Sequence, residues 1–172
     1  RFDPFYYRLF NVFFHILAGL CVYYFIKDLC RMAKNRPFLL NHGPTLAFIS
    51  SGLFLLHPVQ TQTISYVIQA RLEGIATFFV LATILAYVKL IQAQSTWAKI
   101  LLGSLFGLSA FVSCGTKELV VVMPLLLLLV DWFFLSQEQW SFFKKRIWFH
   151  ALFIAAFAAV IIHYLGSRFA TD

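Results

Sequence analysis

Arg71 and Lys117 are the residues of this sequence whose types and positions best suit the binding of an anion. Arg71 directly precedes an apolar run that begins at Leu72, and Lys117 separates two further apolar runs. A guanidinium group can hold phosphate oxygens through two parallel hydrogen bonds, and an ammonium group acts on them as a point charge. We expect both cations at a lipid–water boundary, which is also the depth of a lipid phosphate. Together with Arg168 they form a set that can hold the head group of a polyprenyl phosphate.

Polar side chains of other types are expected to line the same site. Asn11 and His15 are four residues apart inside an apolar run, so they share one face of a helix. Polar groups inside a membrane span are costly and usually face a partner or a cavity. The other members of the expected lining are His57, Gln60, Tyr66, Glu73 and Glu118.

These residues also have structural interpretations, which the sequence leaves open. Glu73 can simply mark the start of a helix, where the helix dipole favours an acid. His57 can cap the end of a helix, and Lys117–Glu118 can form a charged turn. The pair Asn11 and His15 can serve helix packing.

No metal site and no cofactor are expected. His150 and His163 have no third ligand nearby, and the three cysteines are scattered without a metal-binding spacing. Asp131 lies near the end of an apolar run, where we expect it to reach water or to pair with a lysine in a structural role.

The composition indicates that these residues are positioned by membrane-spanning helices. Of 172 residues, 61% are hydrophobic and 12% are charged, against about 45–50% and about 25% in soluble domains. Such a chain is neither disordered nor a water-soluble globule. The net charge of +7 fits basic cytoplasmic loops better than nucleic-acid binding.

The apolar runs predict an all-α, polytopic membrane protein with about six transmembrane helices. The expected spans are 9–26, 38–57, 72–91, 100–116, 119–135 and 147–166. Runs such as 125–130 do not alternate, which excludes a membrane barrel. Pro58 is expected to end a helix, and residues 58 to about 70 to form an interfacial helix, because one continuous helix to Lys89 would exceed the bilayer core. We expect a single transmembrane domain over 1–172 and, because the chain begins at Arg1, a fragment of a longer protein.

The distribution of Lys and Arg predicts the orientation of these spans. Nine of the fourteen fall in one set of loops and five in the other, so the first set is expected in the cytoplasm. That set consists of Lys27, Arg31, Lys34, Arg36, Lys89, Lys99, Lys144, Lys145 and Arg146.

Three segments resemble the motifs of one family. Segment 57–71 begins His-Pro-Val-Gln-Thr-Gln and closely resembles the signature HPxQTQxxxYxxQR of bacterial multi-spanning proteins that often carry tetratricopeptide repeats. Segment 7–15 resembles their YxLxNxxxH motif, and segment 116–131 resembles KExxxxxPLxxxxxD. These proteins are similar to the transmembrane and tetratricopeptide repeat O-mannosyltransferases, and both belong to the GT-C class of glycosyltransferases.

The resemblance implies a part of a GT-C-like helical bundle in the bacterial inner membrane, active on its extracytoplasmic face. The implied donor is a polyprenyl-phosphate sugar, and the implied acceptor is a hydroxyl group, commonly Ser or Thr of an exported protein, which attacks the anomeric carbon with inversion. The implied catalytic base is an acid in the first outer loop, after a span that this chain lacks. Asp3 does not match that motif, so we expect the base upstream.

Two departures from the family pattern occur in and directly after segment 57–71. Gln62 replaces the Glu of the animal relatives, and segment 70–73 differs from the bacterial QRMxS form. No tetratricopeptide repeat occurs in this chain, and we expect the repeats downstream.

Two functions of other classes stay open. A non-catalytic subunit or scaffold of a membrane complex would fit the missing first span and missing acid. A transporter is disfavoured, because most charges lie at the ends of spans and no duplicated halves are visible.

Overall fold

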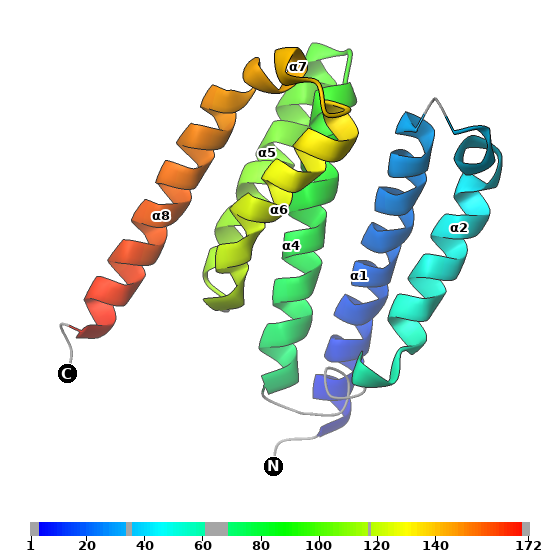
Figure 1. The fold of residues 1–172 in the computed structure, drawn as a ribbon. Helices are drawn as coiled ribbons and strands as arrows, with labels where there is room; N and C mark the ends of the chain where they lie inside the picture. Colours follow the sequence, from blue (N-terminus) through cyan, green and yellow to red (C-terminus); the bar gives the residue numbers. More distant parts are fainter. Residues whose placement is uncertain (1–3, 34–35, 61–68, 117, 170–172) are drawn as a thin grey trace. The chain divides into compact units, whose positions relative to one another are not determined.

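The computed structural model describes residues 4–33, 36–60, 69–116 and 118–169, and in these ranges it contains helices and no strand. The chain divides into two compact units, Arg1–Lys117 and Glu118–Asp172. Helices α1 (Pro4–Met32), α2 (Pro37–Leu56), α4 (Gln69–Gln92) and α5 (Thr96–Cys114) form the first unit, with a short 3₁₀ helix, η1 (Pro58–Gln60). The second unit consists of η2 (Glu118–Val122), α6 (Met123–Val130), the π-helical η3 (Asp131–Leu135), α7 (Trp140–Lys144) and α8 (Ile147–Phe169) (Figure 1).

Small residues bring α1 and α2 together in the first unit. Ser51 Oγ donates a hydrogen bond to the carbonyl oxygen of Gly19 over 2.8 Å, and Gly43 faces Cys30. A Cβ atom at Gly19 would lie only 2.6 Å from Leu55 Cδ2, so the absence of a side chain there permits this close approach. The pairing of early α1 residues with late α2 residues makes the two helices antiparallel (Figure 1).

Helix α4 packs parallel to α1 and antiparallel to α5. The rings of Phe14 and Phe78 lie 5.5 Å apart between α1 and α4, and Asp28 binds Lys89 near the C-terminal ends of the same helices. Between α4 and α5, the buried hydroxyl groups of Thr83 and Ser109 lie 2.9 Å apart. The first unit therefore has a His57 end, where α1 and α4 begin and α2 and α5 finish, and an opposite Lys89 end.

Proline residues determine both limits of α2. Pro37 occupies the first turn, where its missing N–H is not needed. His57 has extended backbone angles of φ −65° and ψ 130°, because the residue before Pro58 avoids the helical conformation. The predicted helix end at Pro58 is thereby confirmed.

In the second unit, α6 and α8 are joined by η3 and α7. The π-helical turn leaves the backbone N–H of Ser136 bound to the carbonyl oxygen of Asp131 over 2.7 Å. The chain then reverses through Gln137 and Glu138, which have positive φ angles of 50° and 60°. The rings of Trp132, Trp140 and Phe143 pack against one another and hold this turn together.

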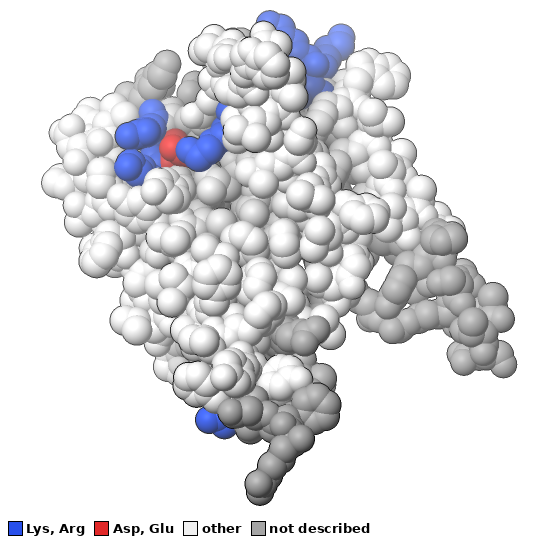
Figure 2. Space-filling model, turned by 180° about the vertical axis from the view of Figure 1, so that it is seen from behind, with Lys and Arg blue, Asp and Glu red and all other residues white. Residues whose placement is uncertain are grey.

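Within the described residues, four helical segments are long and apolar enough to cross a membrane, which indicates an integral membrane protein. They are Phe5–Met32, Pro37–Leu56, Leu72–Gln92 and Thr96–Cys114. Large apolar side chains remain exposed along these helices, and the face shown in Figure 2 carries few charged side chains among its described residues. The all-α class is confirmed.

The remaining parts of the predicted architecture stay predictions. The apolar segments Val120–Leu135 and Ile147–Val160 are shorter than the four candidate spans, so six crossings, their limits, the single domain and the GT-C-like bundle are not established. Of the expected interfacial helix, the structure contains the turn Pro58–Gln60, and residues 61–68 lie outside the described part.

Candidate functional site

His57 lies at the exposed end of α2 and organises the turn that follows. Its Nδ1 accepts a hydrogen bond from the backbone N–H of Val59 over 3.2 Å, and the N–H of Gln60 is bound by the carbonyl oxygen of His57 over 2.9 Å. A neutral ring that accepts through Nδ1 carries its hydrogen on Nε2. His57 therefore stabilises the 3₁₀ turn, and its ring also remains exposed to a ligand.

His15 connects α1 to the same end of α2. Its Nε2 lies 3.1 Å from the carbonyl oxygen of Leu55, and its ring stacks on Phe54 at 5.5 Å. The last four carbonyl groups of a helix have no partner within the helix, and Leu55 provides one of them. Because a carbonyl oxygen can only accept, His15 donates from Nε2. Segment 7–15 thus contacts the last turn of α2, two residues before segment 57–71 begins at His57.

Asn11 and Glu73 lie at this end as well. Asn11 is 1% exposed and lies one turn before His15 on α1. Phe14 and Phe78 are in ring contact, and a rise of about 1.5 Å per residue places Asn11 and Glu73 within about two turns of that contact. Glu73 is half-buried in the first turns of α4, where the helix dipole favours an acid.

The two proposed phosphate ligands are only partly described. Arg71 belongs to the first turn of α4 by its backbone, and α5 returns the chain to the His57 end at Cys114. Lys117 and Tyr66 lie outside the described residues, as do the side chains of Arg71 and Glu118. The backbone thus brings α4 and α5 to one end of the first unit, whereas the convergence of the two cations stays a prediction.

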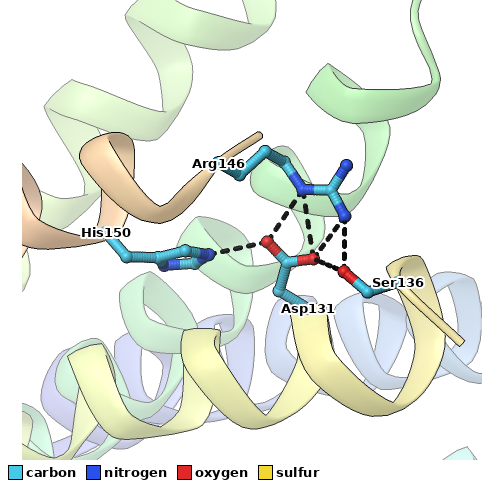
Figure 3. Close-up of polar contacts among 4 residues, drawn as sticks. All are labelled: Asp131, Ser136, Arg146 and His150. Atoms are coloured by element: carbon cyan, nitrogen blue, oxygen red, sulfur yellow. Dashed lines mark hydrogen bonds and ion pairs between the residues drawn. The ribbon is translucent and has the colours of Figure 1, made fainter. Parts of the chain in front are cut away.

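A buried ionic cluster in the second unit escaped the sequence analysis. Asp131 is fully buried, and its carboxylate receives hydrogen bonds from Arg146 Nε at 2.9 and 3.1 Å and from Arg146 Nη2 at 2.5 Å. His150 Nε2 lies 2.6 Å from Asp131 Oδ2, and the Ser136 hydroxyl lies 2.9 Å from Oδ1 (Figure 3). Arg146 Nη2 also donates to the Ser136 hydroxyl over 2.8 Å.

This cluster joins three parts of the second unit. Asp131 begins the π-helical turn, Ser136 follows it, Arg146 immediately precedes α8, and His150 lies in the first turn of α8. The ring of Phe143 stacks on His150 at 5.7 Å and shields it. Because a buried charge is tolerated only when it is paired and hydrogen-bonded, the cluster stabilises one particular arrangement of α6, the turn and α8.

The expectation for Asp131 is corrected in its partner and its exposure. The carboxylate does not reach water, and Arg146 rather than a lysine neutralises it. The sequence signal was present: Arg146 and His150 are four residues apart and share one helix face, which could meet an acid in a neighbouring apolar run. Ser136, five residues after Asp131, was not predictable, because only a π-helical turn returns it to the carboxylate.

No group of three or more His, Cys, Asp or Glu side chains that could hold a metal occurs in the part of the chain that the structure describes. Comparisons of the chain with protein families, with curated proteins and with solved structures return no match.

Proposed function

We propose that this chain is the membrane-embedded part of a glycosyltransferase that uses a polyprenyl-phosphate sugar. The sugar would pass to a hydroxyl acceptor, commonly protein Ser or Thr, on the extracytoplasmic face of the bacterial inner membrane. The observation that carries the proposal is the contact between His15 and Leu55. It supports the proposal because the segment that resembles YxLxNxxxH contacts the residue two positions before the segment that resembles HPxQTQ.

Each residue of this site has a proposed role. Arg71 and Lys117 bind the donor phosphate, which leaves as polyprenyl phosphate when the acceptor oxygen attacks the anomeric carbon. Glu118 orients Lys117, and His57 shapes the site or binds the acceptor. The remaining lining residues are Asn11, His15, Gln60, Tyr66 and Glu73. The acceptor proton passes to a carboxylate base, and no residue of this chain is assigned that role.

The test is sugar transfer by the full-length protein in liposomes, with a labelled polyprenyl-phosphate sugar and a Ser/Thr acceptor peptide. Arg71→Ala and Lys117→Ala should each abolish transfer without loss of expression. Lys99→Ala is the matched control, because this exposed lysine lies at the Lys89 end, and it should transfer at the wild-type rate. Normal transfer by both site variants would refute the roles of the two cations.

A non-catalytic subunit is the second candidate, and the described acids favour it. Asp28 and Asp131, two of the four acids with described side chains, are both held in ion pairs. If the chain is a scaffold, the wild-type protein should show no transfer alone and should purify with a stoichiometric membrane partner that restores it.

A further inference from the structure

At the Lys89 end, Arg31 and Lys89 lie near one buried acid, Asp28, and Lys27 is the preceding residue of α1. We call Lys27, Asp28, Arg31 and Lys89 the Lys27 cluster. Asp28 Oδ2 lies 2.7 Å from Lys89 Nζ, and Asp28 Oδ1 lies 4.0 Å from a nitrogen of Arg31. The Asp28 side chain is 5% exposed, whereas Arg31 is 70% exposed. One carboxylate cannot neutralise three cations, so a positive excess faces outwards. Figure 2 shows basic side chains beside an acidic one on a surface that is otherwise mostly uncharged.

Aromatic rings hold the lysines of the cluster without neutralising them. Lys27 Nζ lies 5.5 Å from the ring centroid of Tyr23 and 6.0 Å from that of Tyr24. Lys89 Nζ lies 5.9 Å from the same Tyr24 ring. A cation over a ring keeps its charge available to an anion, and tyrosine is enriched at the depth of lipid head groups.

An exposed apolar row on α1 leads directly to these cations. Leu9, Phe13, Ile16, Leu20 and Tyr24 are 55%, 55%, 49%, 48% and 46% exposed. They follow one another at spacings of three or four residues, and Lys27 and Arg31 continue the same spacing. Residues at these spacings share one helix face. The row from Leu9 to Tyr24 spans about 22 Å at about 1.5 Å per residue. One leaflet accounts for half of a bilayer core of about 30 Å, so the row is longer than the depth of one leaflet.

We propose that this face of α1 binds an anionic phospholipid, whose phosphate lies between Lys27 and Arg31 and whose acyl chain follows Leu20 and Ile16. Charge complementarity selects the phosphate, and the apolar row selects a lipid over a free phosphate ion. Lys89 remains bound to Asp28 and supports the site from α4. This proposal does not depend on the proposed sugar transfer, because it concerns the opposite end of the first unit.

The test is lipid binding to the full chain, measured by native mass spectrometry in detergent. The probe is phosphatidylglycerol, compared with phosphatidylcholine that carries the same acyl chains. Wild type should bind phosphatidylglycerol at least tenfold more tightly. The double variant Lys27→Gln/Arg31→Gln should weaken that binding about 30-fold, since each surface cation contributes about a sixfold effect on affinity for anionic lipid.

The matched control is Lys144→Gln/Lys145→Gln, which removes the same charge from exposed positions of the second unit. This variant should bind like wild type, and an equal loss in both double variants would overturn the proposal. Displacement of the lipid by glycerol phosphate at equal concentration would also overturn it, because the acyl contact would then be irrelevant. A lipid-free dimer that Lys27→Gln/Arg31→Gln disrupts would overturn the proposal and assign the face to a second copy instead.

Folding of the variants is checked by helical circular dichroism. Arg31→Gln alone serves if the double variant does not fold, because Arg31 is largely exposed and leaves the Asp28–Lys89 pair intact. It should weaken phosphatidylglycerol binding about sixfold, and unchanged binding would overturn the proposal.

Discussion

His15 on α1 donates a hydrogen bond to the carbonyl oxygen of Leu55, which lies near the end of α2, over 3.1 Å. The two residues are forty positions apart in the sequence. The bond provides a donor for a carbonyl group that has no partner within α2. It also connects α1 to the last turn of α2, two residues before His57.

Replacing His15 should therefore weaken the contact between α1 and α2. We expect His15→Ala to lower the free energy of unfolding by about 0.6–1.7 kcal/mol, the range measured for hydrogen bonds between membrane helices. The measurement is equilibrium unfolding in detergent micelles. His15→Gln retains an N–H donor and should recover part of the loss, whereas equal losses in both variants would argue against the hydrogen bond.

Gly19→Ala should separate α1 from α2 for steric reasons. The added methyl group would lie 2.6–2.9 Å from three carbon atoms of Leu55, and overpacking of this kind costs about 1–3 kcal/mol. Thermal unfolding measures the effect. Gly52→Ala is the matched control, because a Cβ atom there meets nothing within 4 Å. In a Leu55→Ala background the clashing carbon atoms are absent, so Gly19→Ala should cost less stability there than in the wild type. The effects of the two substitutions should therefore not add.

Asp131→Asn should destabilise the second unit strongly. The change removes the counter-charge of the partly buried Arg146 guanidinium, and breaking a buried pair costs about 3–5 kcal/mol. Glu138→Gln is the control, since this acid is exposed and should change stability little. Chemical denaturation of both variants provides the comparison. Similar midpoints would mean that the buried charge pair does not hold α6 to α8.

Ser136→Ala should have a smaller effect on the same cluster. The hydroxyl bridges Asp131 Oδ1 and Arg146 Nη2, and removing a hydrogen bond of this type costs about 0.5–1.5 kcal/mol. A double-mutant cycle with Arg146→Met measures the coupling between the two side chains. Ser141→Ala, at an exposed position, should show no coupling to Arg146.

Much of the secondary structure follows from the sequence alone. Apolar runs of span length must satisfy their backbone hydrogen bonds internally, so they form helices in a membrane. Pro58 favours the end of α2 at Leu56, because the helical conformation is unfavourable for the residue before a proline. The apolar runs therefore predict the all-helical class, and Pro58 predicts the end of α2.

The polar contacts could not be predicted in the same way. The partners of His15 and Asp131 depend on how each helix is rotated and shifted along its axis relative to its neighbour. The spacing of apolar residues predicts that rotation poorly in a membrane, because lipid and the protein interior are equally apolar. A π-helical turn decides that Ser136 reaches Asp131, and close packing at Gly19 decides that His15 reaches Leu55. The sequence by itself thus determined the helices and the phosphate-binding hypothesis for Arg71 and Lys117. Only the tertiary structure decided which buried polar groups pair, because such pairs are made between helices rather than within them.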